Sequence, residues 1–324
     1  MKIIGGEAEL KKIDMNEYIT DSGRSSLRLI LQKLKKKKFL IPNYLCVIIL
    51  KILNEYEVNY SFYNIKKNLS IDNKSIIKQS YDAIYIINYF GKKHNIANII
   101  DEEKFVIEDN VFSPLFLNHQ NYPNWVGFNS FRKISPLADG SLIKSSFPLP
   151  NSLIKDNSSE FSKKKYTAKD MKYNFIRYNQ FSEKQYLNLF KLAENKLDEQ
   201  VTINNISSYS LFRLFDFMSG IEKEYSVRKN NFNVLDKHLN DKAIKINTIY
   251  PSFFILSVER RDDLRKYLFS KNIFCPVHWP RINGLSNELN ETLLSIPVDS
   301  RYNEKDMKNI ASYINRFYKV KLIL

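Results

Sequence analysis

Hydrophobic and polar positions follow two different periods over the first half of the chain. Residues 24–34 and 44–53 carry apolar side chains at the spacing of one helix face, which predicts two helices. Short apolar runs predict four strands, at residues 39–41, 58–63, 83–89 and 104–107. Alternating helices and apolar strands are typical of a mainly parallel central sheet with helices on both faces.

The second half of the chain is predicted to be mostly helical. Residues 149–173 are polar, rich in Ser and Lys and interrupted by Pro150, so we expect a connecting loop there. Helical spacing recurs at residues 181–197, 210–225, 227–239, 261–271 and 303–318, and residues 246–258 are strand-like. We therefore expect an α/β fold with a large domain over residues 1–200 and a smaller C-terminal α+β domain over residues 201–324.

Composition and charge narrow the class of protein. With 44% hydrophobic and 26% charged residues, the 324-residue chain is typical of a soluble globular protein. Part of its net charge of +15 lies in lysine runs, which usually mark solvated helix ends or loops. The charge can also attract a phosphorylated metabolite, a membrane surface or nucleic acid. No basic helix is interleaved with base-stacking aromatic residues, so nucleic acid is not the expected partner.

The chain shows no sequence signal for export, membrane insertion or metal binding. Its N-terminus lacks the apolar core of a signal peptide, and its longest apolar stretch, residues 44–53, is too short to span a bilayer. The two cysteines form no CxxC pair, and no His, Cys and Asp spacing resembles a metal site. We expect a cytoplasmic protein without a membrane span.

A carboxylate and a lysine carry the strongest chemical signal. Asp109 follows the apolar run 105–107, which places it at the carboxyl end of a strand, where open α/β sheets bind ligands. Lys133 closes the motif Ser130-Phe-Arg-Lys133 and is followed by Gly140. Lysine can hold an aldehyde as a Schiff base, serine can bind a phosphate, and aspartate can pair with a protonated pyridine nitrogen. Together these residues predict pyridoxal phosphate, although Asp109 taken alone also suits a helix cap or an ion pair.

Two further segments are candidates for ligand binding. Gly23, Arg24 and Ser25 lie directly before or within the first predicted helix, where backbone N–H groups can cradle a phosphate; simple capping is the alternative. His278 and Trp279 stand between two prolines in an aromatic setting, which suits either substrate binding or packing. The other histidines, His94, His119 and His238, are expected on the surface because their neighbours are polar.

The order and spacing of these motifs resemble the DegT/DnrJ-type sugar aminotransferase family, a branch of the fold type I pyridoxal phosphate enzymes. The resemblance rests on residues 22–27, 41–46, 88–91, 106–109, 130–133 with Gly140, 276–280, and 294–297 with residues 301–302. It implies Lys133 for the Schiff base, Asp109 for the pyridine nitrogen, and Ser130 with the backbone near Arg24 for the phosphate. It also implies a homodimer with active sites at the subunit interface.

The chain departs from the family pattern at two cofactor positions. Phe112 stands where the family usually has Gln or His near the cofactor hydroxyl, and Cys46 stands where an aromatic or histidine side chain commonly stacks on the ring. Tyr44 or Tyr89 can take over the stacking. No segment clearly matches the Asn-x-Arg that the second subunit normally offers to the phosphate, so we expect a divergent member.

The expected activity is transamination. The resemblance implies that glutamate provides an amino group for a ketone of a nucleotide-linked sugar, or a related phosphorylated metabolite, in surface polysaccharide biosynthesis. A sugar dehydratase is a second hypothesis, but the relatives with that chemistry have histidine in place of the lysine, which argues against it. A non-catalytic binding or regulatory protein that retains the fold is the third.

Overall fold

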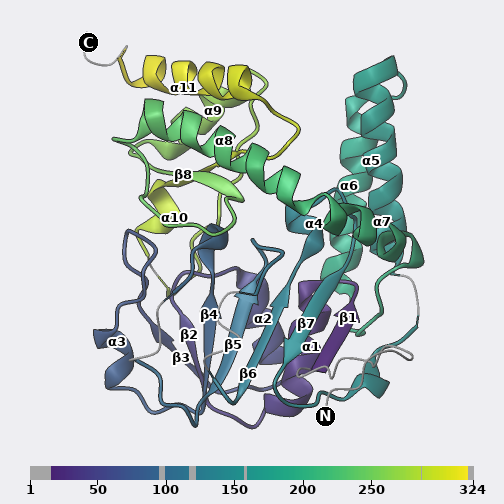
Figure 1. The fold of residues 1–324 in the computed structure, drawn as a ribbon, viewed down its shortest axis with the longest axis vertical. Helices are drawn as coiled ribbons and strands as arrows, with labels where there is room; N and C mark the ends of the chain where they lie inside the picture. The colour runs from purple at the N-terminus through teal and green to yellow at the C-terminus, as the bar shows by residue number, and fades with distance from the viewer. Residues whose placement is uncertain (1–15, 95–98, 117–121, 157–158, 286, 320–324) are drawn as a thin grey trace, which may run out of the picture.

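The computed structural model describes residues 16–94, 99–116, 122–156, 159–285 and 287–319. Seven strands form one sheet in the order β1-β7-β6-β5-β4-β2-β3 (Figure 1). Their bounds are β1 Asn16–Thr20, β2 Phe39–Pro42, β3 Tyr60–Tyr63, β4 Ala83–Ile87, β5 Phe105–Asn110, β6 Trp125–Asn129 and β7 Ser141–Ser145. Strands β2 to β6 run parallel, whereas β7 is antiparallel to both β6 and β1. The predicted mainly parallel sheet is confirmed.

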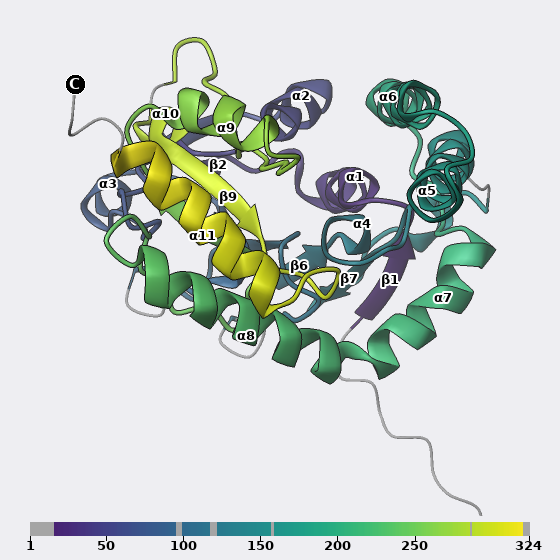
Figure 2. The same cartoon turned by 90° about the horizontal axis from the view of Figure 1, so that it is seen from above.

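The helices of the first half cover this sheet and extend from it. They are α1 Gly23–Leu34, α2 Val47–Glu55, α3 Lys74–Ile77, α4 Phe131–Ile134, α5 Glu160–Tyr178 and α6 Glu183–Glu199, with 3-10 turns at Tyr89–Gly91 and Asn151–Leu153. Helices α1 and α2 lie on one face of the sheet (Figure 2). The α1 side chains that the predicted stripe contains, among them Leu27, Ile30 and Leu34, are buried in the main core, as burial of one helix face requires.

A second apolar cluster forms in the C-terminal part of the chain. Strands β8 Phe253–Ser257 and β9 Leu293–Pro297 pair antiparallel, and they pack with α8 Ile221–Leu239, α9 Arg261–Phe269 and α11 Glu304–Lys319. The remaining helices are α7 Ser208–Ser219 and α10 Leu289–Thr292. In Figure 1 this layer lies beyond the end of the main sheet. The boundary near residue 200 stays a prediction.

The predicted loop over residues 149–173 was wrong, because most of that segment belongs to α5. Phe161, Ala168 and Phe175 recur every seven residues and face α6, whose Tyr186 ring lies 5.6 Å from Phe175. Helices that bury such a stripe against each other form a stable antiparallel pair even when most other positions are polar. The many lysines and serines of α5 therefore concealed the helical spacing of its apolar residues.

Four of the described strands were missed in the sequence, namely β9 and three strands of the main sheet, β1, β6 and β7. Strand β6 contains Gly127, where an added Cβ would lie 2.5 Å from the Trp125 ring, so the glycine admits that ring. Strand β7 begins and ends with buried serines. Small and polar residues in these strands obscured the apolar runs that usually identify a buried strand.

Candidate active site

Three predicted segments converge at one edge of the sheet. Asp109 is paired in register with Phe128, and β6 ends at Asn129, directly before Ser130 and α4. The start of α1 approaches the same place, because a Cβ added to Gly23 would lie 3.3 Å from the Phe128 ring and 3.5 Å from the Asn129 carbonyl oxygen. Parallel strands thus bring the carboxylate, the lysine motif and a helix N-terminus together, as predicted for this kind of sheet.

Asp109 is a buried carboxylate with neutral partners. One of its oxygens accepts a hydrogen bond from the Tyr85 hydroxyl at 2.6 Å, and the other accepts one from the Val111 N–H at 3.0 Å. Burial raises the pKa of Asp109 to about 6, although both hydrogen bonds and the charge of Lys133 act in the opposite direction. A cationic ligand beside this carboxylate would keep it ionised.

Lys133 lies within α4, and the residue is exposed to solvent even though many protein atoms lie near its ammonium group. The loss of solvation, followed by repulsion from Arg132, lowers the pKa of Lys133 to about 8. Its ammonium group makes no ion pair with any described residue. At neutral pH roughly a tenth of such a lysine is uncharged amine, the form that attacks an aldehyde.

The N-terminus of α1 is a candidate phosphate site. Ser22 caps the helix, since its side-chain oxygen accepts a hydrogen bond from the Ser25 N–H at 3.2 Å. Within the described part of the chain, the N–H groups of Gly23 and Arg24 have no protein acceptor. They stand at the positive end of a 12-residue helix, which favours an anion. The alternative of simple capping is therefore present, and it leaves these two N–H groups without a protein acceptor among the described residues.

The side chains of Arg24 and Ser25 are already engaged by protein groups. The Arg24 guanidinium forms an ion pair with Asp198 at 2.5 Å. The Ser25 hydroxyl donates to Asp21 at 2.6 Å. Of these two residues, it is the Arg24 backbone N–H, and not either side chain, that is free to hold a ligand.

Asp21 is a buried residue that the sequence reasoning missed. It directly precedes the Ser22 cap, and its carboxylate accepts side-chain hydrogen bonds from Ser22, Ser25, Ser159 and Gln200. Burial raises its pKa, while these four donors lower it. An acidic residue immediately before a Ser-Gly-Arg-Ser helix start is the signal that could have found it.

The predicted aromatic residues form one buried cluster. The Tyr44 ring centroid lies 5.5 Å from that of Tyr89 and 5.3 Å from that of Trp279. The Phe112 centroid lies 5.3 Å from His278 and 6.0 Å from Trp279. All five side chains are buried. The structure therefore brings these five predicted residues together and shows that packing is at least part of their role.

The charge of Lys133 interacts with two other predicted site residues, His278 and Cys46. Burial, and next the Lys133 charge, lower the pKa of His278 to about 3, and its Nδ1 lies 2.8 Å from the Ser295 hydroxyl. His278 is therefore neutral near pH 7. Cys46 precedes α2, is half-buried, and interacts with the charges of Lys133 and Arg132. Both residues therefore lie within electrostatic range of Lys133.

Two of the other histidines, His94 and His238, differ in their exposure to solvent. His94 was expected on the surface, but only 4% of it is exposed, and one of its ring nitrogens lies 3.0 Å from the Ile87 carbonyl oxygen. Burial, followed by repulsion from Lys92, lowers its pKa to about 4. The surface prediction for His94 was wrong. Its sequence neighbours are polar, but the hydrogen bond to the carbonyl oxygen at the end of β4 satisfies the buried ring. His238 is exposed, as predicted, and His119 lies outside the described residues.

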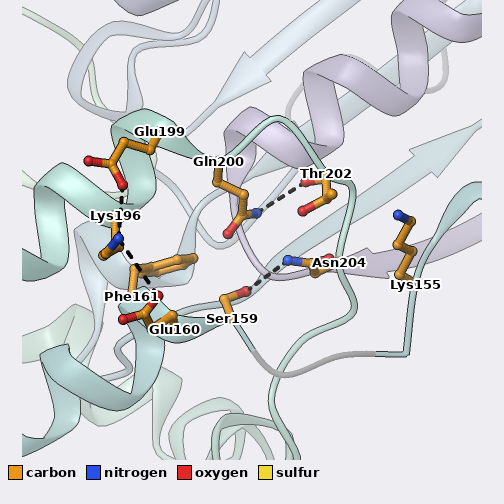
Figure 3. Close-up of a pocket in the computed structure, with 9 residues that line it drawn as sticks. All are labelled: Lys155, Ser159, Glu160, Phe161, Lys196, Glu199, Gln200, Thr202 and Asn204. Carbon is orange, nitrogen blue, oxygen red and sulfur yellow. Dashed lines mark hydrogen bonds and ion pairs between the residues drawn. The ribbon is translucent and has the colours of Figure 1, made fainter.

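A separate pocket of about 330 Å³ opens between the beginning of α5 and the end of α6 (Figure 3). Its lining includes Ser159 and Gln200, the two distant donors to Asp21, but none of the predicted site residues. Across the described ranges, no three His, Cys, Asp or Glu side chains are grouped to hold a metal ion. None of the described helices is both long and apolar enough to cross a membrane.

Solved structures of transferases have the same fold. No protein-family model and no curated protein matches the sequence. A DegT DnrJ EryC1 StrS aminotransferase from Brucella abortus is similar over 93% of this chain and 85% of its own, with 14% identity and a TM-score of 0.65. DesV from S. venezuelae, solved with a ketimine intermediate, is similar over 93% and 84%, with 12% identity and a TM-score of 0.63.

A sugar dehydratase is similar to the same extent. The structure of GDP-4-keto-6-deoxymannose-3-dehydratase with bound GDP-perosamine covers 92% of this chain and 88% of its own, with 14% identity and a TM-score of 0.62. The fold is therefore that of the fold type I pyridoxal phosphate-dependent transferases, as predicted. The chain shares this fold with a DegT/DnrJ/EryC1/StrS aminotransferase at low sequence identity. At these identities the likeness establishes the fold.

Proposed function

We propose that the protein is a pyridoxal phosphate-dependent aminotransferase that acts on a keto group of a nucleotide-linked sugar or a related phosphorylated metabolite. The observation that carries the proposal is the arrangement of Lys133, with its lowered pKa, and the buried Asp109 at one sheet edge. The fold, shared with sugar aminotransferases, supports it.

The residues at this edge fit the three chemical groups of the cofactor. Lys133 supplies an amine without an ion pair among the described residues, for the aldehyde. Asp109 supplies a buried carboxylate for a protonated ring nitrogen. The Gly23 and Arg24 N–H groups, with Ser130 at the start of α4, supply an anion site for the phosphate. The aromatic cluster supplies apolar contacts for a ring, whereas Phe112 can donate no hydrogen bond to its hydroxyl.

When bound, pyridoxal phosphate supplies an electron sink that stabilises negative charge on a substrate carbon. Asp109 would hold the proton on the ring nitrogen, and the Tyr85 hydroxyl would orient that carboxylate. The Lys133 amine, once released by the incoming amino substrate, would carry a proton between substrate and cofactor carbons. Its lowered pKa keeps it closer to the value at which a base is effective near neutral pH.

The donor, assembly and pathway are further parts of the proposal. We infer glutamate as the amino donor, a cytoplasmic homodimer with active sites at its interface, and a role in surface polysaccharide biosynthesis, because the motif resemblance implies them. Exposed apolar side chains on α7, including Phe212 at 73% and Phe215 at 72% exposure, support an association between subunits.

Dehydration is the second candidate, because a sugar dehydratase has a similar fold. In the relatives with dehydratase chemistry, histidine stands at the Schiff-base position. A histidine there cannot form an imine with the cofactor aldehyde. Lys133 therefore favours transamination.

The visible absorption spectrum tests the cofactor assignment. Wild-type protein reconstituted with pyridoxal phosphate should show a Schiff-base band that Lys133→Ala lacks. Glutamate should bleach the wild-type band and yield one 2-oxoglutarate per site, and this separates transamination from dehydration. A wild type that stays colourless after reconstitution would contradict the enzyme proposal and favour a binding protein with the same fold.

A further inference from the structure

A buried arginine connects the C-terminal layer, formed by β8, β9, α8, α9 and α11, to the turn that carries Lys133. Arg228 lies in α8, with 4% of its surface exposed, and stands 94 positions after Ile134 in the chain. Its Nη2 donates to the Ile134 carbonyl oxygen at 3.0 Å, and Ile134 is the residue directly after Lys133. Figure 1 shows the first half of α8 beside α4. A direct hydrogen bond therefore connects α8 to the lysine motif.

The other nitrogens of the Arg228 guanidinium bind groups of the C-terminal layer. Its Nε donates to the Glu224 carboxylate at 2.6 Å, one turn earlier on α8. Its Nη1 donates to the carbonyl oxygen of Ser252, directly before β8, at 3.3 Å. A planar guanidinium presents its donors in fixed directions, so it can satisfy these acceptors in few arrangements. Arg228 therefore fixes the Ile134 carbonyl relative to both α8 and β8.

Helix α4 is a single turn, and its own backbone does little to hold its C-terminal end. The last carbonyl groups of a helix have no donor within that helix. No described backbone N–H donates to the Ile134 carbonyl, so the arginine provides the donor that the helix lacks. The Phe131 and Ile134 side chains are buried in a cluster with Leu137 and Tyr250. Apolar packing therefore holds one side of the turn, and the arginine holds its end.

We propose that Arg228 is a positioning residue for Lys133: by binding the Ile134 carbonyl, it fixes the turn from which the lysine amine reaches its reaction partner. The use of that amine rests on the proposed function, whereas the hydrogen bond does not. Arg228 acts through the backbone of Ile134 and not on the reacting atoms. Because reacting groups must be held to within a fraction of an ångström, a loosened turn should change the chemistry of Lys133.

Arg261 is a matched control in the same layer. It is also buried, with 7% of its surface exposed, and its two Nη atoms donate to the carbonyl oxygens of Leu293 and Asn290, each at 3.0 Å. Its Nε donates to Asp262 at 2.7 Å. Like Arg228, it therefore binds one carboxylate and two main-chain carbonyls, but neither carbonyl belongs to α4. Substitution of either arginine by methionine removes the same kinds of hydrogen bond and keeps an apolar stem.

Competitive acetylation of Lys133 in the cofactor-free protein, followed by mass spectrometry across about pH 6 to 11, tests the inference. Wild type should reach half-maximal labelling near pH 8, because the loss of solvation lowers the pKa of Lys133 to about 8. Arg228→Met should raise that pH by about 1, since a released turn lets the ammonium group move into water. Arg261→Met should change it by less than about 0.3, because the bonds it loses lie outside α4.

The variant Arg228→Lys distinguishes hydrogen bonding from charge. It keeps the positive charge near Glu224, but a single ammonium group does not present the planar fork that spans the carbonyls of Ile134 and Ser252. We expect it to raise the pH of half-maximal labelling as well, and it is the milder substitution if Arg228→Met does not fold. After addition of pyridoxal phosphate, both variants should form the visible band about tenfold more slowly than wild type.

The outcomes separate this inference from the proposed function. An unchanged labelling profile in both Arg228 variants, or an equal shift in Arg261→Met, would overturn the positioning role. A wild-type profile in Arg228→Lys beside a shifted one in Arg228→Met would also overturn it, because the charge and not the fork would then act on Lys133. Shifted profiles in a protein that takes up no pyridoxal phosphate would support the connection between Arg228 and Lys133 while contradicting the aminotransferase proposal.

Discussion

Two buried carboxylates lie at the same edge of the sheet and differ in their partners. Asp21 follows β1 and accepts four side-chain hydrogen bonds, which come from α1, from the residue before α5 and from the residue after α6. Asp109, near the end of β5, accepts two and senses the charge of Lys133. A carboxylate whose acceptor sites are filled by protein donors joins elements together, whereas one with few donors near a lysine is suited to a ligand.

The largest expected effect is on activity, and it should be seen when Asp109 is substituted. Asp109→Asn should lower the rate of the glutamate half-reaction by on the order of a thousandfold, because the neutral amide cannot keep the ring nitrogen protonated. The free energy of unfolding of the ligand-free variant should not fall, since the Asn oxygen can accept from the Val111 N–H while its amide N–H donates to the Tyr85 hydroxyl oxygen. Stopped-flow absorbance measures the rate of the half-reaction, and urea unfolding measures the free energy of unfolding. A rate within tenfold of wild type would remove Asp109 from the cofactor site.

Substitution of Asp21 should instead lower mainly the free energy of unfolding. Asp21→Ala leaves the hydroxyls of Ser22, Ser25 and Ser159 and the amide of Gln200 without their common acceptor. We expect the free energy of unfolding to fall by about 3 kcal/mol, the range for buried unsatisfied donors. Urea unfolding of the ligand-free variant checks this. An unchanged stability would show that Asp21 does not join α1 to the α5–α6 hairpin.

Titration of Asp109 should make stability depend on pH. Its carboxyl has a pKa of about 6 in the folded protein, against an ordinary value of 3.8, so the folded state binds the proton more tightly. The contribution, about 3 kcal/mol, is fully present below about pH 4 and is lost as pH rises through about 6. Asp109→Asn should lack this component when unfolding is compared with wild type between pH 4 and 7. Parallel profiles for the two proteins would contradict the raised pKa.

The smallest expected effect concerns the orientation of Asp109. Tyr85→Phe removes the hydroxyl that donates to Asp109 at 2.6 Å, while the ring stays in the core. The half-reaction should slow by about tenfold, the equivalent of one lost hydrogen bond to a charged group. The KM for glutamate should change little, because the Tyr85 side chain is fully buried and its hydroxyl is bonded to the Asp109 carboxylate. A larger effect on KM than on the rate would assign Tyr85 to substrate binding.

The contrast between the carboxylates also explains what the sequence could predict. Asp109 lies near the end of β5 and Lys133 follows β6, so parallel pairing of these neighbouring strands brings both residues to one edge, and their proximity is inferable from strand order. Asp21 depends on Ser159 and Gln200, which are 138 and 179 positions away along the chain. Their meeting depends on the α5–α6 hairpin, the helix pair whose first half was predicted as a loop.

Identification of the lysine that binds the cofactor tests the central claim most directly. The chain has 50 lysine and arginine residues in total, so colour alone does not identify the site. The protein loaded with pyridoxal phosphate is reduced with borohydride, digested and examined by mass spectrometry. Our account predicts stoichiometric phosphopyridoxyl label on the peptide that contains Lys133. Label confined to another lysine such as Lys165 or Lys169, or spread without preference over surface lysines, would contradict it.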